Sequence, residues 1–273
     1  PSTGDAYLVI DGYTDMSEIK IDPAKRQISG WVNNQRFVND SKSFRSYFVV
    51  QFDKAFEDYG VWENQKDEIF PQKQEGEGKG YGAYIKFKKG SKVQAKAASS
   101  YISAEQALVT LNQELGKDKN LETTKVRGQK TWNELLNRVL VEGGTDEQMK
   151  TFYSCLFRAN LFSRKFYERK ENGEPYYYSP YDGKVYDGYM YTDNGFWDTF
   201  RSQFPLTNIL HPTMQGRYMN ALLAAQEQCG WLPSWSAPGE TGGMLGNHAI
   251  SLLADAWAKG IRSFDPEKAL KAY

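Results

Sequence analysis

Two short segments combine carboxylates, aromatic rings and glycines. The first, residues 191–201, reads YTDNGFWDTFR, and the second, residues 230–248, reads GWLPSWSAPGETGGMLGNH. Each comes directly before a stretch with helical periodicity. Cleavage of a glycosidic bond needs carboxyl groups that transfer protons, and aromatic side chains offer flat faces to sugar rings. The two segments therefore indicate carbohydrate chemistry at loops that precede helices.

Glu240 is the candidate proton donor. It lies in a turn rich in glycine and proline, and Trp231 and Trp235 precede it. Aromatic surroundings disfavour the charged form of a carboxyl group, which suits a general acid. A solvated carboxylate at the start of a helix would show the same pattern, so the residues alone leave both interpretations open.

The WDTFR segment offers Asp198 as a contact for substrate hydroxyls and Trp197 as a platform for a sugar ring. The simpler interpretation makes Asp198 a first-turn carboxylate that pairs with Arg201, and makes Trp197 a core residue. Taken alone, the pattern favours the simpler interpretation. His248 could line the same face, although a hydrogen-bonded structural histidine is the commoner case.

Other chemistries lack their motifs. The sequence has no nucleophile elbow, no phosphate-binding loop and no EF-hand spacing. His211 and His248 are the only histidines, which excludes a multi-histidine metal site within this chain. Cys155 and Cys229 match neither a zinc site nor a redox pair. We expect two buried free thiols, with a disulfide as the less favoured alternative.

The composition limits further the classes of partner that the chain could bind. The 273 residues suffice for two domains, and 34 basic residues balance 34 acidic ones. A neutral chain without long single-sign runs argues against nucleic acid, and no stretch is apolar enough to span a bilayer. We expect no signal peptide in this sequence, but a mature secreted protein would look the same.

The first hundred residues alternate with period two and are separated by turn residues, which predicts a sandwich of antiparallel strands. Residues 74–80 are polar and rich in glycine, so we predict a hairpin loop there. The predicted strands cover residues 6–11, 18–21, 27–32, 46–52, 59–62, 81–87 and 93–97.

Helical periodicity begins after Tyr101. Ser103 with Gln106 and Thr145 with Gln148 predict capping boxes, and Asp265 before proline predicts another helix start. Residues 165–194 lack a lasting period, which predicts a long loop with at most a short hairpin. Further helices are predicted at 104–115, 132–140, 149–156, 197–208, 213–229 and 243–259. The predicted domains are a β-sandwich at 1–100, a helical linker at 101–141 and a helical domain at 142–273.

Several motifs in a fixed order resemble glycoside hydrolase family 92. The resemblance rests on VEGGTDEQ at 141–148, WDTFR at 197–201, GWLP at 230–233 and the run from Glu240 to Ala249. It covers the chain from about Ser103 onwards. SYFVVQF at 46–52 resembles the family's β-sandwich more loosely.

The resemblance implies an α+β multidomain fold, with a partial N-terminal antiparallel β-sandwich followed by the first part of an (α/α)6 toroid. It implies inverting, calcium-dependent removal of terminal α-linked mannose from glycans, in the periplasm or outside the cell. Glu240 is the expected proton donor, and the expected substrate contacts are Trp197, Asp198, Arg201 and His248.

The general base and the calcium ligands are expected beyond residue 273, so this chain alone is expected to be an inactive internal fragment that needs the rest of its own chain. The alternatives are another inverting glycosidase on an (α/α)6 toroid, and a carbohydrate-binding protein without catalysis.

Overall fold

The computed structural model describes residues 5–12, 16–34, 44–66 and 68–272. The chain divides into two compact units, one of described residues up to Lys125 and the other from Val126 onwards. Helix α2 (Leu121–Leu136) runs across this division.

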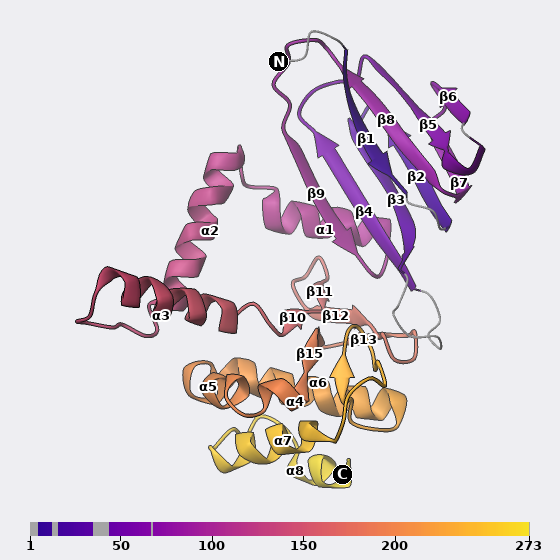
Figure 1. The fold of residues 1–273 in the computed structure, drawn as a ribbon. Helices are drawn as coiled ribbons and strands as arrows, with labels where there is room; N and C mark the ends of the chain where they lie inside the picture. The colour runs from indigo at the N-terminus through magenta and orange to yellow at the C-terminus, as the bar shows by residue number, and fades with distance from the viewer. Residues whose placement is uncertain (1–4, 13–15, 35–43, 67, 273) are drawn as a thin grey trace. The chain divides into compact units, whose positions relative to one another are not determined.

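The first unit contains two antiparallel sheets (Figure 1). One sheet has the order β1-β8-β5-β6 and the other the order β7-β2-β3-β4-β9. A short 3-10 helix, η1 (Asn64–Lys66), follows β5. The strands are β1 (Ala6–Asp11), β2 (Met16–Asp22), β3 (Gln27–Asn34), β4 (Phe44–Phe52), β5 (Asp58–Glu63), β6 (Glu68–Pro71), β7 (Glu75–Lys79), β8 (Tyr81–Phe87) and β9 (Ala95–Ser100).

Alternation along the strands builds a common core. Ile19 and Ile28 of one sheet and Val61 and Ile85 of the other belong to a single buried cluster. Since successive side chains of a strand point to opposite faces, each of these strands can give every second residue to the cluster. The predicted antiparallel β-sandwich is therefore confirmed.

The predicted hairpin loop at 74–80 is wrong, because this segment forms β7 at the edge of a sheet. Gly76 of β7 pairs with Ile19 of β2. A Cβ on Gly76 would overlap the ring of Tyr81, and one on Gly78 would lie 2.9 Å from the same ring. These glycines make room for an aromatic side chain that packs across them, a requirement that local sequence does not show.

Helix α1 (Ala104–Leu115) covers the five-stranded sheet through Ala107 and Leu111, which pack on Val49 of β4. Ser103 caps this helix by accepting a hydrogen bond from the backbone of Gln106. The Gln106 side-chain amide donates to Thr110.

The second unit is mainly helical. Thr145 and Gln148 form the predicted capping box of α3, with both reciprocal hydrogen bonds present. Phe196, Met219 and Leu252 lie in one buried cluster that joins the later helices. The helices are α3 (Asp146–Ala159), α4 (Phe196–Thr199), α5 (Gln203–Leu210), α6 (Pro212–Cys229), α7 (His248–Ala258) and α8 (Pro266–Lys271).

Helix α7 begins at His248 and not at Gly243 as predicted. Gly242 and Gly246 both have positive φ, at 64° and 76°, which interrupts helical backbone before His248. Asp265 caps α8 as expected by accepting from the backbone of Glu267 and Lys268.

Residues 165–194 contain more regular structure than predicted. Strands β11 (Glu168–Arg169), β12 (Pro175–Tyr178) and β13 (Val185–Asp187) form a three-stranded sheet. The remaining short strands pair in twos, and they are β10 (Arg164–Lys165), β14 (Tyr191–Thr192), β15 (Asn194–Gly195) and β16 (Trp235–Ser236).

Both cysteines are free, as predicted, but Cys155 is exposed, so the expectation of a buried thiol there is wrong. Its helix, α3, buries only Leu156 among its residues, so most of its surface stays open within this chain. Cys229 is half-buried, and burial raises the pKa of its thiol.

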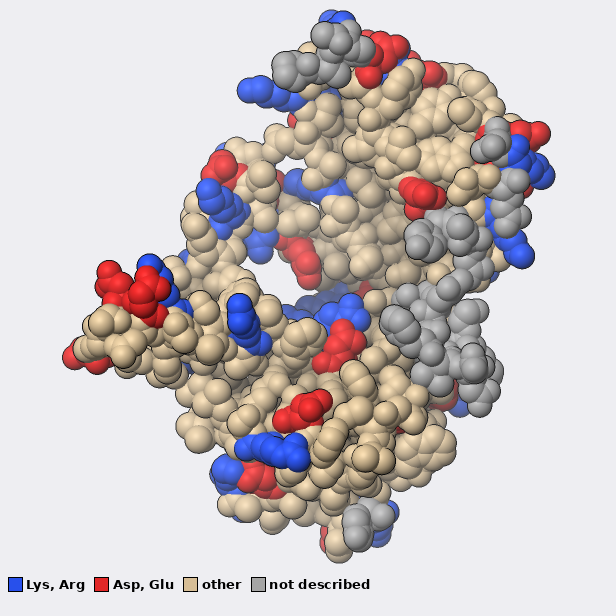
Figure 2. All heavy atoms as spheres, in the orientation of Figure 1, with Lys and Arg blue, Asp and Glu red and all other residues tan. Residues whose placement is uncertain are grey.

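Within the described residues, no helix has the length and apolar character needed to cross a membrane. On the face shown in Figure 2, acidic and basic side chains are interspersed.

Candidate active site

A two-residue strand pair brings the two chemistry-bearing segments together. Asn194 pairs with Ser236, and Gly195 pairs with Trp235, in the antiparallel pair β15–β16. Ser236 also forms a β-bridge with Glu240. The WDTFR segment and the turn that carries Glu240 thus start from adjacent backbones, although about forty residues separate them in sequence.

Gly195 lies where the two segments meet. A Cβ at this position would lie 3.2 Å from Asp198 Oδ2 and 3.8 Å from the indole of Trp235. The Asp198 carboxylate and the Trp235 ring therefore both border the same backbone position. An alanine Cβ at 195 would crowd the Asp198 carboxylate and would touch the Trp235 ring at ordinary van der Waals distance.

The Glu240 carboxylate is fixed by its own turn. The backbone amide of Ser234 donates to Oε2 at 2.6 Å. The Ser234 hydroxyl and the Gly242 amide donate to Oε1 at 2.9 and 2.7 Å. Gly239 and Gly242 adopt positive φ, which lets the chain fold this tightly around the carboxylate.

Three tryptophans of the two segments keep large exposed surfaces. Trp197, Trp231 and Trp235 are 40%, 57% and 37% exposed. Among the described residues, Trp197 therefore does not belong to a buried core. Exposed indoles beside two carboxylates provide apolar faces of the kind that sugar rings can contact.

Two of the predicted substrate-binding residues contact the ring of Phe200. His248, at the start of α7, stacks on the Phe200 ring with a centroid distance of 4.5 Å and an interplanar angle of 8°. The Arg201 guanidinium lies 4.6 Å from the centroid of the same ring and donates to the Trp197 carbonyl. Arg201 thus contacts aromatic rings, and in the described part of the chain it does not form the ion pair with Asp198 that the simpler interpretation expected.

The predicted site residues therefore fall into two groups. The β15–β16 pair brings together the segments that carry Asp198 and Glu240, and Phe200 contacts both Arg201 and His248. The hydrogen bonds that Glu240 accepts all come from its own turn in the described structure. Sequence patterns pointed to neither Ser234 nor Phe200, because their contacts depend on the folded turn and on packing between α4 and α7.

Carboxylates and a histidine in these segments raise the question of a metal ion. Across residues 5–12, 16–34, 44–66 and 68–272, no group of three or more His, Cys, Asp or Glu side chains could hold a metal ion. Calcium prefers six to eight oxygen ligands with several carboxylates among them. The side chains of the residues that the structure describes do not by themselves fit such a site.

Comparison with known proteins connects both units to one family. Residues 1–100 match the glycosyl hydrolase family 92 N-terminal domain, and residues 106–273 match the glycosyl hydrolase family 92 catalytic domain. The chain belongs to glycoside hydrolase family 92, as its motifs predicted. A search of curated protein sequences gave no match.

Solved structures agree with this assignment. A family GH92 inverting mannosidase from Bacteroides thetaiotaomicron VPI-5482 is 44% identical, with a TM-score of 0.93 over 100% of this chain. A GH92 α-mannosidase from Bacteroides thetaiotaomicron is 24% identical, with a TM-score of 0.87 over 100% of this chain and 38% of its own, and was also solved with mannoimidazole. The present chain spans 37% of the length of the first of these structures.

Proposed function

We propose that the protein carrying this chain hydrolyses terminal α-linked mannose in glycans, with Glu240 as the proton donor. Family membership and the 44% identity to an inverting mannosidase support the reaction class. The observation that carries the residue assignment is the β15–β16 pair, which sets the Glu240 turn against the segment of Asp198 and Trp197.

The hydrogen bonds of Glu240 indicate which oxygen carries the catalytic proton. Each carboxylate oxygen can accept about two hydrogen bonds. Oε1 accepts two, from Ser234 Oγ and Gly242 N, whereas Oε2 accepts one, from Ser234 N. Oε2 therefore keeps a free acceptor site, and we assign it the proton that passes to the glycosidic oxygen.

The other residues act by binding in this proposal. Asp198 accepts hydrogen bonds from sugar hydroxyls, and the exposed indole of Trp197 packs against the sugar ring. Arg201 and His248, which both contact Phe200, are assigned in this proposal to the border of the same site. Binding that holds the sugar in one orientation lowers the entropic part of the barrier.

Inversion at the anomeric carbon requires a second carboxyl group as general base, roughly 6.5–9.5 Å from the acid so that a water molecule fits between. We propose that this base and the calcium ligands lie in the remainder of the protein, on an (α/α)6 toroid of which α3 to α8 form a part. We further propose a periplasmic or extracellular location, which fractionation of the producing cell would check.

The test is Glu240→Gln in the full-length protein, because glutamine keeps the shape but cannot donate the acid proton. We expect kcat on methyl α-mannoside to fall by about 10²–10⁴-fold. The loss on 2,4-dinitrophenyl α-mannoside should be much smaller, since that leaving group departs without protonation. Affinity for mannose should remain.

Glu227→Gln is the matched control. Glu227 lies on α6 and pairs with Lys268 at the surface, so this substitution should leave kcat unchanged. Equal losses on both substrates would remove the acid role from Glu240. Mannose binding without any turnover by the natural protein would favour a binding protein, and turnover of another aryl α-glycoside in place of the mannoside would favour a different glycosidase.

A further inference from the structure

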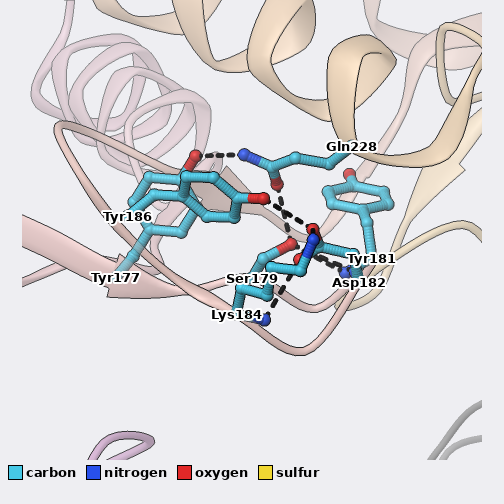
Figure 3. A network of polar contacts seen from close by, with 7 residues as sticks. All are labelled: Tyr177, Ser179, Tyr181, Asp182, Lys184, Tyr186 and Gln228. Atoms are coloured by element: carbon cyan, nitrogen blue, oxygen red, sulfur yellow. Dashed lines mark hydrogen bonds and ion pairs between the residues drawn. The ribbon is translucent and has the colours of Figure 1, made fainter.

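A network of polar contacts joins the loop between β12 and β13 to the end of α6 (Figure 3). Gln228, in the last turn of α6, donates to the Tyr177 hydroxyl at 2.6 Å and accepts from the Ser179 hydroxyl at 2.7 Å. Ser179 is fully buried and also accepts hydrogen bonds from the backbone amides of Tyr181 and Asp182, at 3.1 and 3.3 Å. These bonds attach the loop between β12 and β13 to the end of α6.

Tyr181 extends this network to the candidate site. Its hydroxyl lies 3.1 Å from Ser236 Oγ. Ser236 is 3% exposed and belongs to β16, where it pairs with Asn194 on one side and forms the bridge to Glu240 on the other. Burial raises the pKa of Tyr181, so the phenol keeps its proton and can donate it in this bond at neutral pH.

The turn that holds Glu240 starts and ends at this strand. The Thr241 amide donates to the Trp235 carbonyl at 3.1 Å, and the Ala237 amide donates to the Gly239 carbonyl at 3.0 Å. A shift of Ser236 would therefore move both ends of the turn. The bond from Tyr181 reaches Ser236 from outside the turn, from a segment that Gln228 holds in place.

We propose that Tyr181 is a positioning residue, whose hydroxyl fixes Ser236 and so sets the orientation of the Glu240 carboxyl group. The inference rests on the proposed role of Glu240 as the acid. Tyr181 does not touch the substrate in this account. It acts through Ser236 and the backbone of the turn.

A second tyrosine of the same hairpin supplies a matched control. The Tyr186 hydroxyl donates to Asp182 Oδ2 at 2.6 Å, and Lys184 lies 3.6 Å from the same carboxylate oxygen. Figure 3 shows both tyrosines in one network, yet the Tyr186 bond stays within the hairpin. Tyr181→Phe and Tyr186→Phe each remove one hydroxyl and keep the ring, so they differ mainly in whether the lost bond leads to β16.

The experiment compares leaving groups in the full-length protein. For Tyr181→Phe we expect about a tenfold loss of kcat on methyl α-mannoside, the size expected for one hydrogen bond, and less than about a twofold loss on 2,4-dinitrophenyl α-mannoside. Tyr186→Phe should match the natural protein on both substrates. Ser236→Ala should reproduce the Tyr181→Phe loss, and the double variant should lose no more than either single one.

Equal losses on both substrates, or no loss on either, would overturn the proposal, as would the same loss in Tyr186→Phe. Failure of the proposed function is recognised separately, because Glu240→Gln would then show no dependence on the leaving group. Amide hydrogen exchange keeps the inference testable in that case. Exchange at Thr241 should be about tenfold faster in Tyr181→Phe than in Tyr186→Phe, and equal rates would exclude the positioning role.

Discussion

The two units of the chain differ in how completely their helices and strands are buried within the unit. In the sandwich, both sheets contribute to one buried cluster, and α1 covers part of the five-stranded sheet. In the helical unit, α3 buries only Leu156, and α2, which crosses into this unit, buries no described residue. Both units expose large apolar side chains. The sandwich does so at Val9 and Ile69, and the helical unit at more positions, among them Val126, Leu140, Phe152, Phe157, Leu161 and Ile209.

This difference shows what each kind of sequence pattern requires. A strand that alternates finds its partners in neighbouring strands of the same short segment, so the pattern and the packing arise together. An amphipathic helix needs a separate surface that need not be close in sequence. This chain spans 37% of the length of the structure with 44% identity.

The largest effect is expected when a buried side chain is truncated and the result is compared with truncation of an exposed one. Ile85 in β8 is fully buried, and Ile85→Ala should lower the free energy of unfolding by about 2–5 kcal/mol. Val126 in α2 is 63% exposed, and Val126→Ala should change it by less than about 0.5 kcal/mol. Urea unfolding of the 273-residue chain measures both.

The same two variants in the full-length protein test whether α2 is covered there. If the remainder of the protein covers α2, Val126→Ala should cost more there than in the 273-residue chain. A large cost in the short chain would contradict the comparison, because it would mean that α2 is already packed. Leu252→Ala, at a buried position of α7, serves as a control within the helical unit and should behave like Ile85→Ala.

Removal of a helix-capping side chain should have an effect of intermediate size. Ser103 caps α1, which packs on the sheet, and Thr145 caps α3, which has little buried surface. Loss of a capping side chain costs about 1 kcal/mol of helix stability. Ser103→Ala should therefore lower the global free energy of unfolding by about this amount, as urea unfolding would measure.

Thr145→Ala should act locally, because α3 is only weakly coupled to the rest of its unit. We expect faster amide exchange in the first turn of α3 and a small change in the midpoint of global unfolding. The conservative variant Thr145→Ser keeps a hydroxyl that can accept from the Gln148 amide, so it should retain the natural exchange rates. Equal global losses for Ser103→Ala and Thr145→Ala would show that both helices are equally coupled.

The sequence predicted the elements whose signals are local. Alternation and turn residues predicted most strands of the sandwich, and the Thr145 box and the Asp265 cap were found where expected. Strand β7 was missed because its glycines are needed to leave room for the Tyr81 ring, which lies outside the strand. The signal for that packing lies in the fold and not in the glycine-rich run itself.

The candidate site shows the same division. Residue types alone left the role of Glu240 open and favoured the simpler interpretation of Asp198. The resemblance to family 92 supplied both assignments, which stay predictions. The arrangement of these two residues depends on β15 and β16, two-residue strands that carry no periodicity of their own. Tyr181 was hidden for the same reason, because only the folded loop between β12 and β13 brings its hydroxyl to Ser236. The domain boundaries at 100 and 141 stay predictions.

The smallest expected effect is a pH dependence that belongs to the helical unit alone. Both histidines of the chain lie in this unit, and His211, between α5 and α6, is 9% exposed. Burial, and then the charge of Arg138, lowers the pKa of His211 below its ordinary value. The folded state therefore binds this proton less readily than the unfolded state, so His211 destabilises the fold as pH falls below about 6.5 and has no effect above it.

His211→Gln should therefore reduce the dependence of the free energy of unfolding on pH between pH 7 and the lowered pKa, because glutamine takes up no proton in this range. Urea unfolding at several pH values measures this slope, while the protection of sandwich amides, relative to the intrinsic exchange rate at each pH, should stay unchanged over the same range. An unchanged slope in His211→Gln would assign the acid sensitivity to other groups and would remove this difference between the two units.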